Sequence, residues 1–505
     1  MPTAAEMLQA EFGSFADVVR AHAAERPDAG AIATVDRKLS FAELDAYGDL
    51  IAVGLQRDGV PQGEAVAICG LNGWAYAALW LGILRAGAVV APLAQSSTPE
   101  ALALMIEDCG SRLFFADRAI ADTVDIPAGV TFVPLDEEAG FEAWLPEAGA
   151  TPKPVAIDPG DAFNIIYSSG TTGTPKGIVH SHLMRWRHVT AYGGLLFTPQ
   201  TVSLQSTPLY SNTTLVNFLP CLGNGGKSVL MKKFDAREFL TLSEAEGVTT
   251  AMLVPVQYKR LLAEPDFDSF DLSAYQMKFC TSAPFAADLK ADILKRWPGG
   301  LVEFYGMTEG GGSCALRAHE FPDKLHTVGQ PMPGHDIRLI DEDGKEVPQG
   351  GIGEVVGRSG TIMKGYHNRP EQTRATHWHD AEGNLYIRTG DVGRFDEDGF
   401  LQLMDRTKDM IISGGFNIYP SDLEAIVIEH PEVEEVAVIG VASEQWGESP
   451  VGVVVGPSDA EAVKVWANER LGKTQRLAAV HIVDELPRSA IGKVLKRELR
   501  ESLNL

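Results

Sequence analysis

The sequence lacks several features that define other classes of protein. Its 505 residues include five cysteines, without a CxxC pair or a His/Cys metal spacing, so neither a disulfide framework nor a zinc domain is indicated. We expect the cysteines to be buried in a reducing compartment. The most apolar stretch, Ala75 to Ala94, is interrupted by Arg85 and Gly87 and is too short to cross a bilayer. The first fifteen residues have no basic n-region and no apolar core. We therefore expect a cytoplasmic protein with no secretory signal and no integral membrane segment.

Positive charge is also scarce. The chain has 43 Lys and Arg against 68 Asp and Glu, a net charge of -25. A field of that sign repels nucleic acid and anionic lipid, so neither is an expected partner. Hydrophobic residues at 45% and charged residues at 22% are typical of a water-soluble globular protein. At about 150 residues per domain, the length allows about three folding units.

Strand-like and helix-like segments alternate in the first part of the chain. The clearest run is Ala65–Cys69, Trp74–Arg85, Val89–Leu93, Pro99–Glu107 and Arg112–Ala116. Short apolar strands that alternate with helices are typical of parallel βαβ units. The sequence therefore predicts an α/β fold.

The pattern of expected strands and helices changes twice further along the chain. From about Asp336, short strands are separated by turns such as Asp341–Gly344 and Asp396–Gly399, which indicates a small β-rich unit. After Asp405 the chain predicts a helix followed by two strands. These segments are Pro420–Glu429, Val436–Val441 and Val451–Val455. We place a boundary near Asp405 to Lys408, which gives domains of residues 1–405 and 406–505.

The strongest local signal is a loop rich in small and hydroxyl-bearing residues. It reads Ser168-Ser169-Gly170-Thr171-Thr172-Gly173-Thr174-Pro175-Lys176-Gly177 and follows the apolar run Phe163 to Tyr167. Close backbone N–H groups, hydroxyl donors and the charge of Lys176 suit a polyphosphate. The Walker spacing GxxxxGK is absent, so a P-loop NTPase is not indicated. The alternative interpretation of this composition is a flexible turn that binds no phosphate.

This loop resembles the phosphate loop of the adenylate-forming (AMP-binding) enzymes, which include acyl-CoA synthetases, peptide-synthetase adenylation domains and firefly luciferases. Five further motifs occur in that family's order. Two precede the loop, Leu39–Asp45 and Leu84–Leu93, and three follow it, Tyr305–Glu309 (YGxTE), Thr389–Asp391 (TGD) and Pro487–Lys493 (PxxxxGK). Asp405–Asp409 resembles the family's hinge segment. The chain is therefore identified as a member of the acyl-CoA synthetase (acid–CoA ligase) branch.

The resemblance implies a specific architecture. A large N-terminal domain of doubly wound βαβ subdomains and a small β-rich subdomain would be followed by a smaller, mobile α+β C-terminal domain. Lys408 would be the pivot of that domain, because a hinge residue must tolerate two backbone conformations.

The resemblance also assigns roles at a nucleotide site. Tyr305 would stack on adenine, and Asp391 would accept hydrogen bonds from the ribose hydroxyls. Thr308 would lie near the α-phosphate, and Glu309 would be a ligand of Mg²⁺. The candidate contacts to ATP and coenzyme A are Ser168, Ser169, Gly170, Thr171, Thr172, Gly173, Thr174, Lys176, Ser282, Ala283, Pro284, Tyr305, Gly306, Met307, Asp391, Arg406, Lys408, Gly414, Gly415 and Trp446. Without the resemblance, Tyr305 would be interpreted as a core tyrosine and Asp391 as a turn residue. Glu309 would be a solvated surface acid, and Arg406 would form a surface salt bridge.

Lys493 is the leading catalytic candidate, with Thr308 and Glu309 beside it. A cation near the α-phosphate stabilises the negative charge that develops as a carboxylate attacks phosphorus. By composition alone, the basic C-terminal stretch around Lys493 would be a solvated helix face. After adenylation, the resemblance implies that the C-terminal domain swings and opens a tunnel for the CoA thiol. Gly414 and Gly415 would line that tunnel, and Trp446 would contact the nucleotide of CoA.

The acyl pocket departs from the family pattern. The motif PLxHxxG reads Pro208-Leu209-Tyr210-Ser211-Asn212-Thr213-Thr214, with Ser211 in place of the gating histidine, so a roomier or differently closed entrance is expected. Tyr210, Ser211, Asn212, Thr213 and the Thr281–Pro284 turn are the pocket candidates. No acidic residue occurs from Ser206 to Asn217, which disfavours an amino acid, because its buried ammonium would lack a partner.

We expect the partners to be ATP, Mg²⁺, coenzyme A and a hydrophobic monocarboxylic acid, whether fatty, alicyclic or aromatic. A homodimer is compatible with the sequence. Two alternatives stay open, namely an adenylating enzyme that loads a carrier protein and a nucleotide-binding homologue without catalysis. The presence of both Lys176 and Lys493 argues against the second of these.

Overall fold

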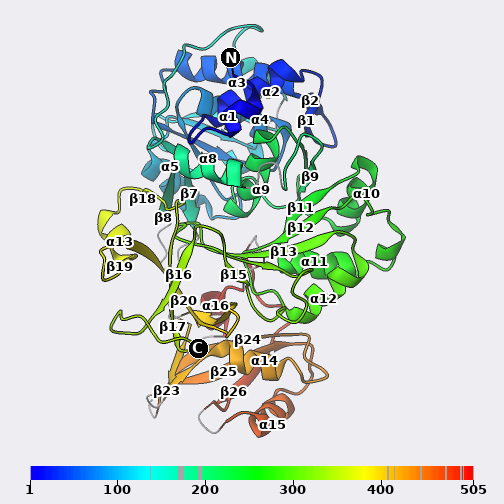
Figure 1. Ribbon diagram of the computed structural model, residues 1–505, viewed down its shortest axis with the longest axis vertical. Coiled ribbons are helices and arrows are strands. Elements are labelled where there is room, and N and C mark those ends of the chain that lie inside the picture. The colour runs from blue at the N-terminus through cyan, green and yellow to red at the C-terminus, as the bar shows by residue number, and fades with distance from the viewer. Residues whose placement is uncertain are drawn as a thin grey trace.

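The structure of the protein is a computed structural model (Figure 1). It describes residues 2–136, 138–168, 176–191, 196–406, 409–413, 416–443, 446–472, 475–489, 492, 494–503 and 505. The chain runs from an N-terminal half at the top of Figure 1 to a small C-terminal sheet at the bottom.

A nine-stranded sheet forms the middle of the large domain. Its order is β15 (Gln330–Pro331), β14 (Cys314–Arg317), β13 (Gly300–Tyr305), β12 (Met277–Cys280), β11 (Thr250–Leu253), β9 (Val202–Gln205), β10 (Lys227–Leu230), β1 (Gly30–Ala33) and β2 (Lys38–Ser40). The six strands from β13 to β1 are parallel, and the pairs at the two edges are antiparallel. The parallel strands therefore end at one common edge.

A seven-stranded sheet occupies the N-terminal part of the domain. Its order is β18 (Gly365–Tyr366), β8 (Lys176–Ser181), β7 (Ala162–Ser168), β4 (Val89–Pro92), β3 (Ala65–Cys69), β5 (Leu113–Ala116) and β6 (Thr131–Pro134). Strands β7 and β8 form the hairpin whose loop carries the phosphate-loop sequence. Ser168 pairs with Lys176 at the base of this loop.

Helices cover both large sheets. They are α1 (Ala4–Leu8), α2 (Phe15–Glu25), α3 (Phe41–Arg57), α4 (Trp74–Arg85), α5 (Pro99–Cys109), α6 (Arg118–Ala121), α7 (Glu138–Trp144), α8 (His182–Ala191), α9 (Asn212–Gly223), α10 (Ala236–Glu246), α11 (Pro255–Leu262), the 3-10 turn η1 (Phe267–Ser269), α12 (Ala287–Arg296) and α13 (Pro370–Ala375). Helix α4 is apolar on nearly all sides, and ten of its twelve residues are therefore buried. Helix α5 begins with Thr98 as its N-cap and Pro99 in the first turn, and it ends at Gly110 with a φ of 68°.

Two smaller sheets complete the chain. The first contains β16 (Asp336–Ile340), β17 (Ile352–Arg358), β20 (Leu385–Phe395), β19 (His377–His379) and β21 (Leu401–Arg406). The second contains β23 (Phe416–Ile418), β22 (Ile411–Ser413), β25 (Gly447–Val455), β24 (Glu435–Ser443) and β26 (Ala479–Ile482), with helices α14 (Pro420–Val427), α15 (Ala460–Arg470) and α16 (Lys496–Ser502). The predicted boundary between residues 405 and 406 falls at the end of β21, and it stays a prediction.

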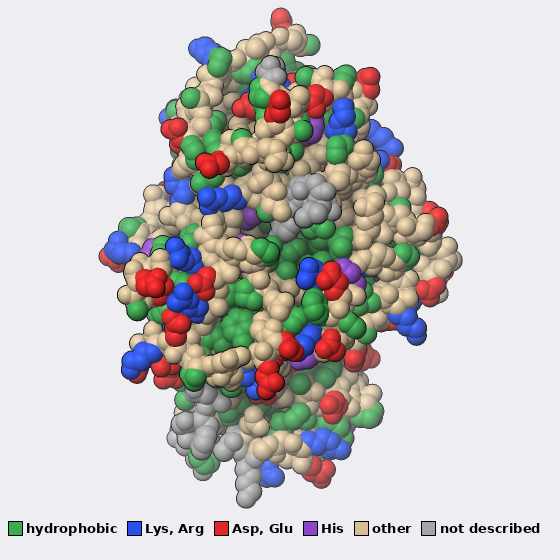
Figure 2. All heavy atoms as spheres, viewed as in Figure 1, with side chains coloured by type: hydrophobic (Ala, Val, Ile, Leu, Met, Phe, Trp, Pro, Cys, Tyr) green, Lys and Arg blue, Asp and Glu red, His purple; other side chains and the backbone are tan. Residues whose placement is uncertain are grey.

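The expected α/β fold is confirmed. One hydrophobic cluster contains residues of both large sheets, such as Ile32 of β1 and Val66 of β3, and a second lies on the nine-stranded sheet. The C-terminal sheet has its own cluster around Ile411, Leu423 and Val454. All five cysteines are buried and free, as expected. Within the described ranges, the hydrophobic stretches of the helices are too short or too polar to span a bilayer. Figure 2 shows acidic and basic side chains interspersed over the face drawn in Figure 1, with hydrophobic side chains grouped around its middle.

Candidate active site

The site is built at the carboxyl edge of the parallel strands in the nine-stranded sheet. The register aligns Leu253 of β11 with Cys280 of β12, and Cys280 with Glu303 of β13. The segments that follow these strands are therefore neighbours, as ligand-binding loops are in open parallel sheets. The Thr281 hydroxyl donates a hydrogen bond of 2.8 Å to the carbonyl oxygen of Phe304, which ties the Thr281–Pro284 turn to the end of β13.

Tyr305 and Asp391, predicted to hold adenine and ribose, are in contact. The Tyr305 hydroxyl donates a hydrogen bond of 2.8 Å to Oδ2 of Asp391. Burial raises the pKa of Tyr305 well above its usual value, and the negative charge of Asp391 adds to this. Asp391 follows Gly390, which has a φ of 71°, and pairs across the strands with Arg406 of β21. Tyr305 and Asp391 therefore meet although they are 86 residues apart in the sequence, and the backbone of Arg406 lies opposite Asp391.

Thr308 and Glu309 follow Tyr305 on the same segment and lie against the hairpin of the other large sheet. Oε1 of Glu309 accepts a hydrogen bond of 2.8 Å from the Tyr366 hydroxyl, and the Tyr366 ring lies 5.3 Å from Nζ of Lys176. Burial and the charge of Glu309 raise the pKa of Tyr366. The carbonyl oxygen of Thr308 is 2.7 Å from Nε2 of His180. Lys176 at the base of the phosphate loop and Glu309 therefore both contact Tyr366.

The oxygen ligands at Thr308 and Glu309 fit a magnesium ion that arrives with a nucleotide. No cluster of three or more His, Cys, Asp or Glu side chains that could hold a metal occurs among the residues described. Mg²⁺ keeps several waters and is usually bound by one or two carboxylates together with substrate phosphates. One carboxylate and the Thr308 hydroxyl are therefore an adequate protein contribution.

The acyl-pocket candidates lie where α9 begins. Oγ1 of Thr213 and Oγ of Ser282 share a hydrogen bond of 2.6 Å, which joins the first turn of α9 to the Thr281–Pro284 turn. Ser282 has a φ of 82°, an unusual value for a residue other than glycine. Ser211 is the N-cap of α9 and accepts a hydrogen bond from the Thr213 amide. Its hydroxyl therefore caps the N-terminus of α9. Its short side chain fits an acyl-pocket entrance that has no gating histidine.

The loop that leads to Lys493 also reaches this edge. Arg488 and Val494 form an antiparallel bridge that brackets the loop. A Cβ atom built on Gly492 would lie 2.7 Å from Cγ1 of Val256 and 3.8 Å from Cγ2 of Val254. The backbone next to Lys493 therefore packs directly against the residues that follow β11.

Some predicted site residues lie outside the described residues. They are Ser169, Gly170, Thr171, Thr172, Gly173, Thr174, Lys408, Gly414, Gly415 and Lys493. Ser168 and Arg406 are placed by their strand pairing. Trp446 lies at the turn between β24 and β25 with 51% of its surface exposed. Among the described contacts, none links Trp446 to Tyr305, Glu309 or Asp391.

Four residues near the site were not predicted from the sequence, namely Asn164, His180, Arg185 and Tyr366. Asn164 and His180 are polar residues inside apolar strands, at Phe163-Asn164-Ile165 and Val179-His180. A polar residue inside an apolar strand is the sequence feature from which a buried polar site could have been predicted. Tyr366 had no comparable signal, because its partner Glu309 is 57 residues away in the sequence.

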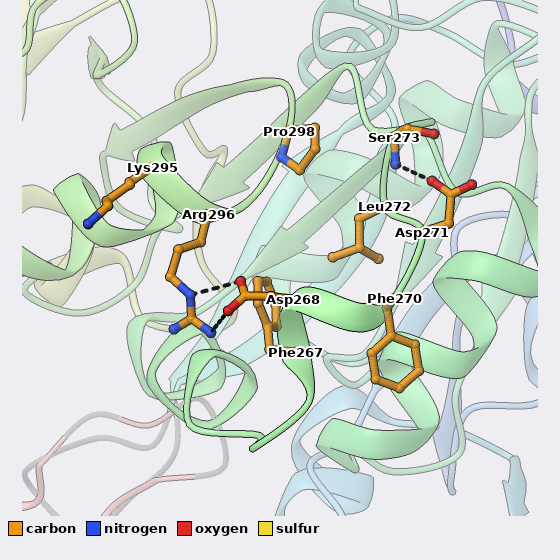
Figure 3. A pocket seen from close by; sticks show the side chains of 9 residues that line it. All are labelled: Phe267, Asp268, Phe270, Asp271, Leu272, Ser273, Lys295, Arg296 and Pro298. Carbon is orange, nitrogen blue, oxygen red and sulfur yellow. Dashed lines mark hydrogen bonds and ion pairs between the residues drawn. The ribbon is translucent and has the colours of Figure 1, made fainter.

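A surface hollow of about 380 Å³ lies away from these residues (Figure 3). It is lined by residues of η1, by the segment before β12 and by the end of α12, where Arg296 forms an ion pair with Asp268. These segments precede β12 and β13, whereas Thr281 and Tyr305 lie at the ends of those strands. The hollow is therefore at the opposite edge of the sheet and is not part of the candidate active site.

Comparisons with known proteins agree with this architecture. The sequence pattern of the AMP-binding enzyme family matches residues 19–367, and that of the AMP-binding enzyme C-terminal domain matches residues 422–493. The chain belongs to the AMP-binding enzyme family. The predicted family and fold class are thereby confirmed.

Three related proteins cover nearly the whole chain. A feruloyl-CoA synthase from Amycolatopsis sp is 35% identical over 94% of this chain and 96% of its own length. An indoleacetate–CoA ligase from Aromatoleum aromaticum is 33% identical over 95% of this chain and 96% of its own length. The crystal structure of ATP-bound MatB from Rhodopseudomonas palustris has a TM-score of 0.84 and is 31% identical, covering 95% of this chain and 96% of that protein.

Proposed function

We propose that this chain is an AMP-forming ligase that joins an aromatic monocarboxylic acid to coenzyme A. The enzyme class, an acid–thiol ligase, is the one that the relatives named above share, and the prediction of that class is confirmed. ATP, CoA and a carboxylic acid are the substrates of this class. The aromatic acid, the magnesium ion and the roles of individual residues are the proposal.

The contact between Tyr305 and Asp391 carries the proposal for the nucleotide. The hydroxyl of Tyr305 holds the Asp391 carboxylate at the edge of the ring. A purine that stacks on this ring would therefore place its ribose next to the carboxylate, which can accept hydrogen bonds from both ribose hydroxyls. The triphosphate would then extend along Gly306 to Glu309 toward Lys176.

The first step would be attack of a carboxylate oxygen of the acid on the α-phosphorus of ATP. The new P–O bond forms as the bond to pyrophosphate breaks, and acyl-AMP results. Lys493 would stabilise the charge that develops at the α-phosphate, since Gly492 packs at the edge where Thr308 lies. A magnesium ion held by Glu309 would neutralise charge on the phosphates. In the second step the CoA thiolate would attack the acyl carbon, and AMP would leave.

A cluster of aromatic rings supports an aromatic acid. The rings of Phe197 and Phe279 lie 6.2 Å apart, and those of Phe279 and Phe304 lie 5.8 Å apart. Val216 of α9 packs against this group. Phe304 directly precedes Tyr305, so the cluster adjoins the proposed adenine site. Flat side chains of this kind favour a planar ring in the acid, which agrees with the acids named for the two curated relatives.

A panel of acids tests this function. The purified chain is given ATP, Mg²⁺ and one acid at a time, and pyrophosphate release is measured without CoA and then with it. We expect substituted cinnamic and arylacetic acids to give the highest kcat/KM, with the acyl-CoA product identified by mass spectrometry. Strong preference for an alkanoic acid would refute the aromatic pocket. Acyl-AMP that accumulates with CoA and is consumed by a phosphopantetheinyl carrier protein would favour the carrier-loading alternative.

A further inference from the structure

A buried polar cluster lies under the Thr308–Glu309 segment. It consists of Asn164 on β7, His180 on β8 and Arg185 on α8, each at most 1% exposed. Asn164 and His180 face each other in the β7–β8 pairing, four positions from the Ser168–Lys176 pair at the base of the phosphate loop. At about 3.3 Å per residue, the cluster lies about 13 Å along the hairpin from that loop.

The hydrogen bonds of His180 fix its tautomer. Nδ1 of His180 lies 2.8 Å from Nη2 of Arg185 and 3.1 Å from Nδ2 of Asn164, and both of these nitrogens carry protons to donate. Nδ1 must therefore be the acceptor, and the ring proton is on Nε2. Nε2 donates this proton to the carbonyl oxygen of Thr308 at 2.7 Å. Burial and the nearby guanidinium hold the pKa of His180 well below its usual value, so the ring is neutral.

Arg185 brings a positive charge that its described neighbours do not balance. Its Nε donates to Oδ1 of Asn164 at 2.9 Å, and its Nη1 lies 3.5 Å from Nδ1 of His188. Burial lowers the pKa of Arg185 to about 9, so the guanidinium is charged at neutral pH. In the described part of the chain, no carboxylate forms an ion pair with it. A buried cation without a counter-charge is unfavourable, and an anion that binds nearby would relieve that cost.

We propose that His180 is a positioning residue for the triphosphate of ATP. With Arg185 behind it, His180 holds the Thr308 carbonyl in place and extends a buried positive potential under the segment that receives the phosphates. This inference rests on the proposed function, which places the ATP phosphates at Thr308 and Glu309. ATP binding would then bring anionic charge near Arg185, and the same potential would favour the charge that develops on the α-phosphate.

The test compares two substitutions that differ in one property. His180→Leu removes all three hydrogen bonds of the ring, whereas His180→Gln keeps a donor for Thr308 and an acceptor for Arg185. ATP binding is measured by calorimetry in the presence of Mg²⁺ and without acid, and kcat and KM are measured from pyrophosphate release. We expect His180→Leu to raise the Kd for ATP about tenfold and His180→Gln to stay within about threefold of the wild type. Wild-type affinity in the leucine variant overturns the proposal, as does equal loss in both folded variants.

Two controls separate this proposal from effects on folding and from failure of the proposed function. His22 is also buried and lies 2.9 Å from a backbone carbonyl, that of Gly223, away from the site. His22→Leu should lower thermal stability and leave the Kd for ATP unchanged. If His180→Leu does not fold, the double variant with Arg185→Met removes the charge together with its partner, and wild-type affinity there overturns the proposal. Weak binding in Glu309→Gln but not in the His180 variants contradicts this inference alone, whereas normal binding in all of them contradicts the proposed function.

Discussion

Arg488 donates a hydrogen bond of 2.9 Å from Nη1 to the carbonyl oxygen of Gly492, the residue before Lys493. Its Nη2 lies 2.6 Å from Oε2 of Glu435 at the start of β24. Oε1 of Glu435 lies 3.8 Å from Nζ of Lys259 on α11 of the large domain. One arginine therefore connects the loop of the proposed catalytic lysine to its own domain and, through Glu435, to the other domain.

Arg488→Ala should slow adenylation selectively. Exposed ion pairs contribute little to stability, but misplacement of a catalytic group is costly for the rate, so we expect about a tenfold loss in acid-dependent pyrophosphate release with little change in Tm. Thioester formation from supplied acyl-AMP should stay within about twofold of the wild type, because the lysine is not needed in that step. Lys464→Ala, which removes a partly buried cation on α15, is the matched control. Equal loss in the two steps would contradict this role for Arg488.

Asp391→Asn should weaken recognition of the ribose. A hydrogen bond to a charged group contributes about 1.5 to 3 kcal/mol, so we expect the KM for ATP to rise at least about tenfold. The wild type should discriminate against 2′-deoxy-ATP, and the variant should lose most of this discrimination. Asp396→Asn is the control, because Asp396 pairs with Lys324 at a surface turn. Full discrimination in Asp391→Asn would show that another residue binds the ribose.

Tyr366→Phe should change the magnesium requirement. The substitution keeps the ring and removes only the hydroxyl that donates to Glu309. We expect the Mg²⁺ concentration for half-maximal activity to rise about threefold to tenfold, since the carboxylate loses one fixed hydrogen bond. Tyr386→Phe, which removes a hydroxyl bonded to Asp336, should leave it unchanged. A magnesium titration that shifts in Glu309→Gln but not in Tyr366→Phe would exclude a role for the tyrosine hydroxyl.

His182 should make stability depend on pH in the mildly acidic range. It is buried against Phe163, and burial lowers its pKa to about 4. The unfolded state, with a histidine pKa of about 6.5, binds the proton more readily, so stability is full above pH 6.5 and falls toward pH 4. We expect the wild type to lose about 2 to 3 kcal/mol more free energy of unfolding than His182→Gln between pH 7 and pH 4.5. Urea unfolding measures this difference, and parallel pH profiles would contradict it.

The elements of the N-terminal sheet could be predicted closely from sequence. The expected strand Ala65–Cys69 and helix Trp74–Arg85 match β3 and α4 at both ends. Their boundaries are sharp because a strand and a helix that are buried on all sides give uninterrupted apolar runs between polar turns. The turns Asp341–Gly344 and Asp396–Gly399 were also predicted correctly, since each glycine has a φ of 78°.

The contacts behind the motifs could not be predicted in the same way. The motifs identify Tyr305 and Glu309, but the partners Tyr366 and His180 depend on strand register and on packing between the two large sheets. The aromatic cluster of Phe197, Phe279 and Phe304 comes from three separate segments, so no local pattern reveals it. The sequence therefore indicated a hydrophobic acid, and the proposal of an aromatic acid depends on the fold.

The most direct test of adenylation follows an oxygen atom from the acid to AMP. The chain is incubated with ATP, Mg²⁺, CoA and an aromatic acid labelled with ¹⁸O in both carboxylate oxygens, and the AMP is analysed by mass spectrometry. Because the bridging oxygen of acyl-AMP stays on phosphorus when the thiol attacks, we predict one ¹⁸O atom in each AMP. Lys493→Ala should form almost no labelled AMP. Acyl-CoA formed with unlabelled AMP, or with the label in phosphate and ADP as the product, would contradict the account.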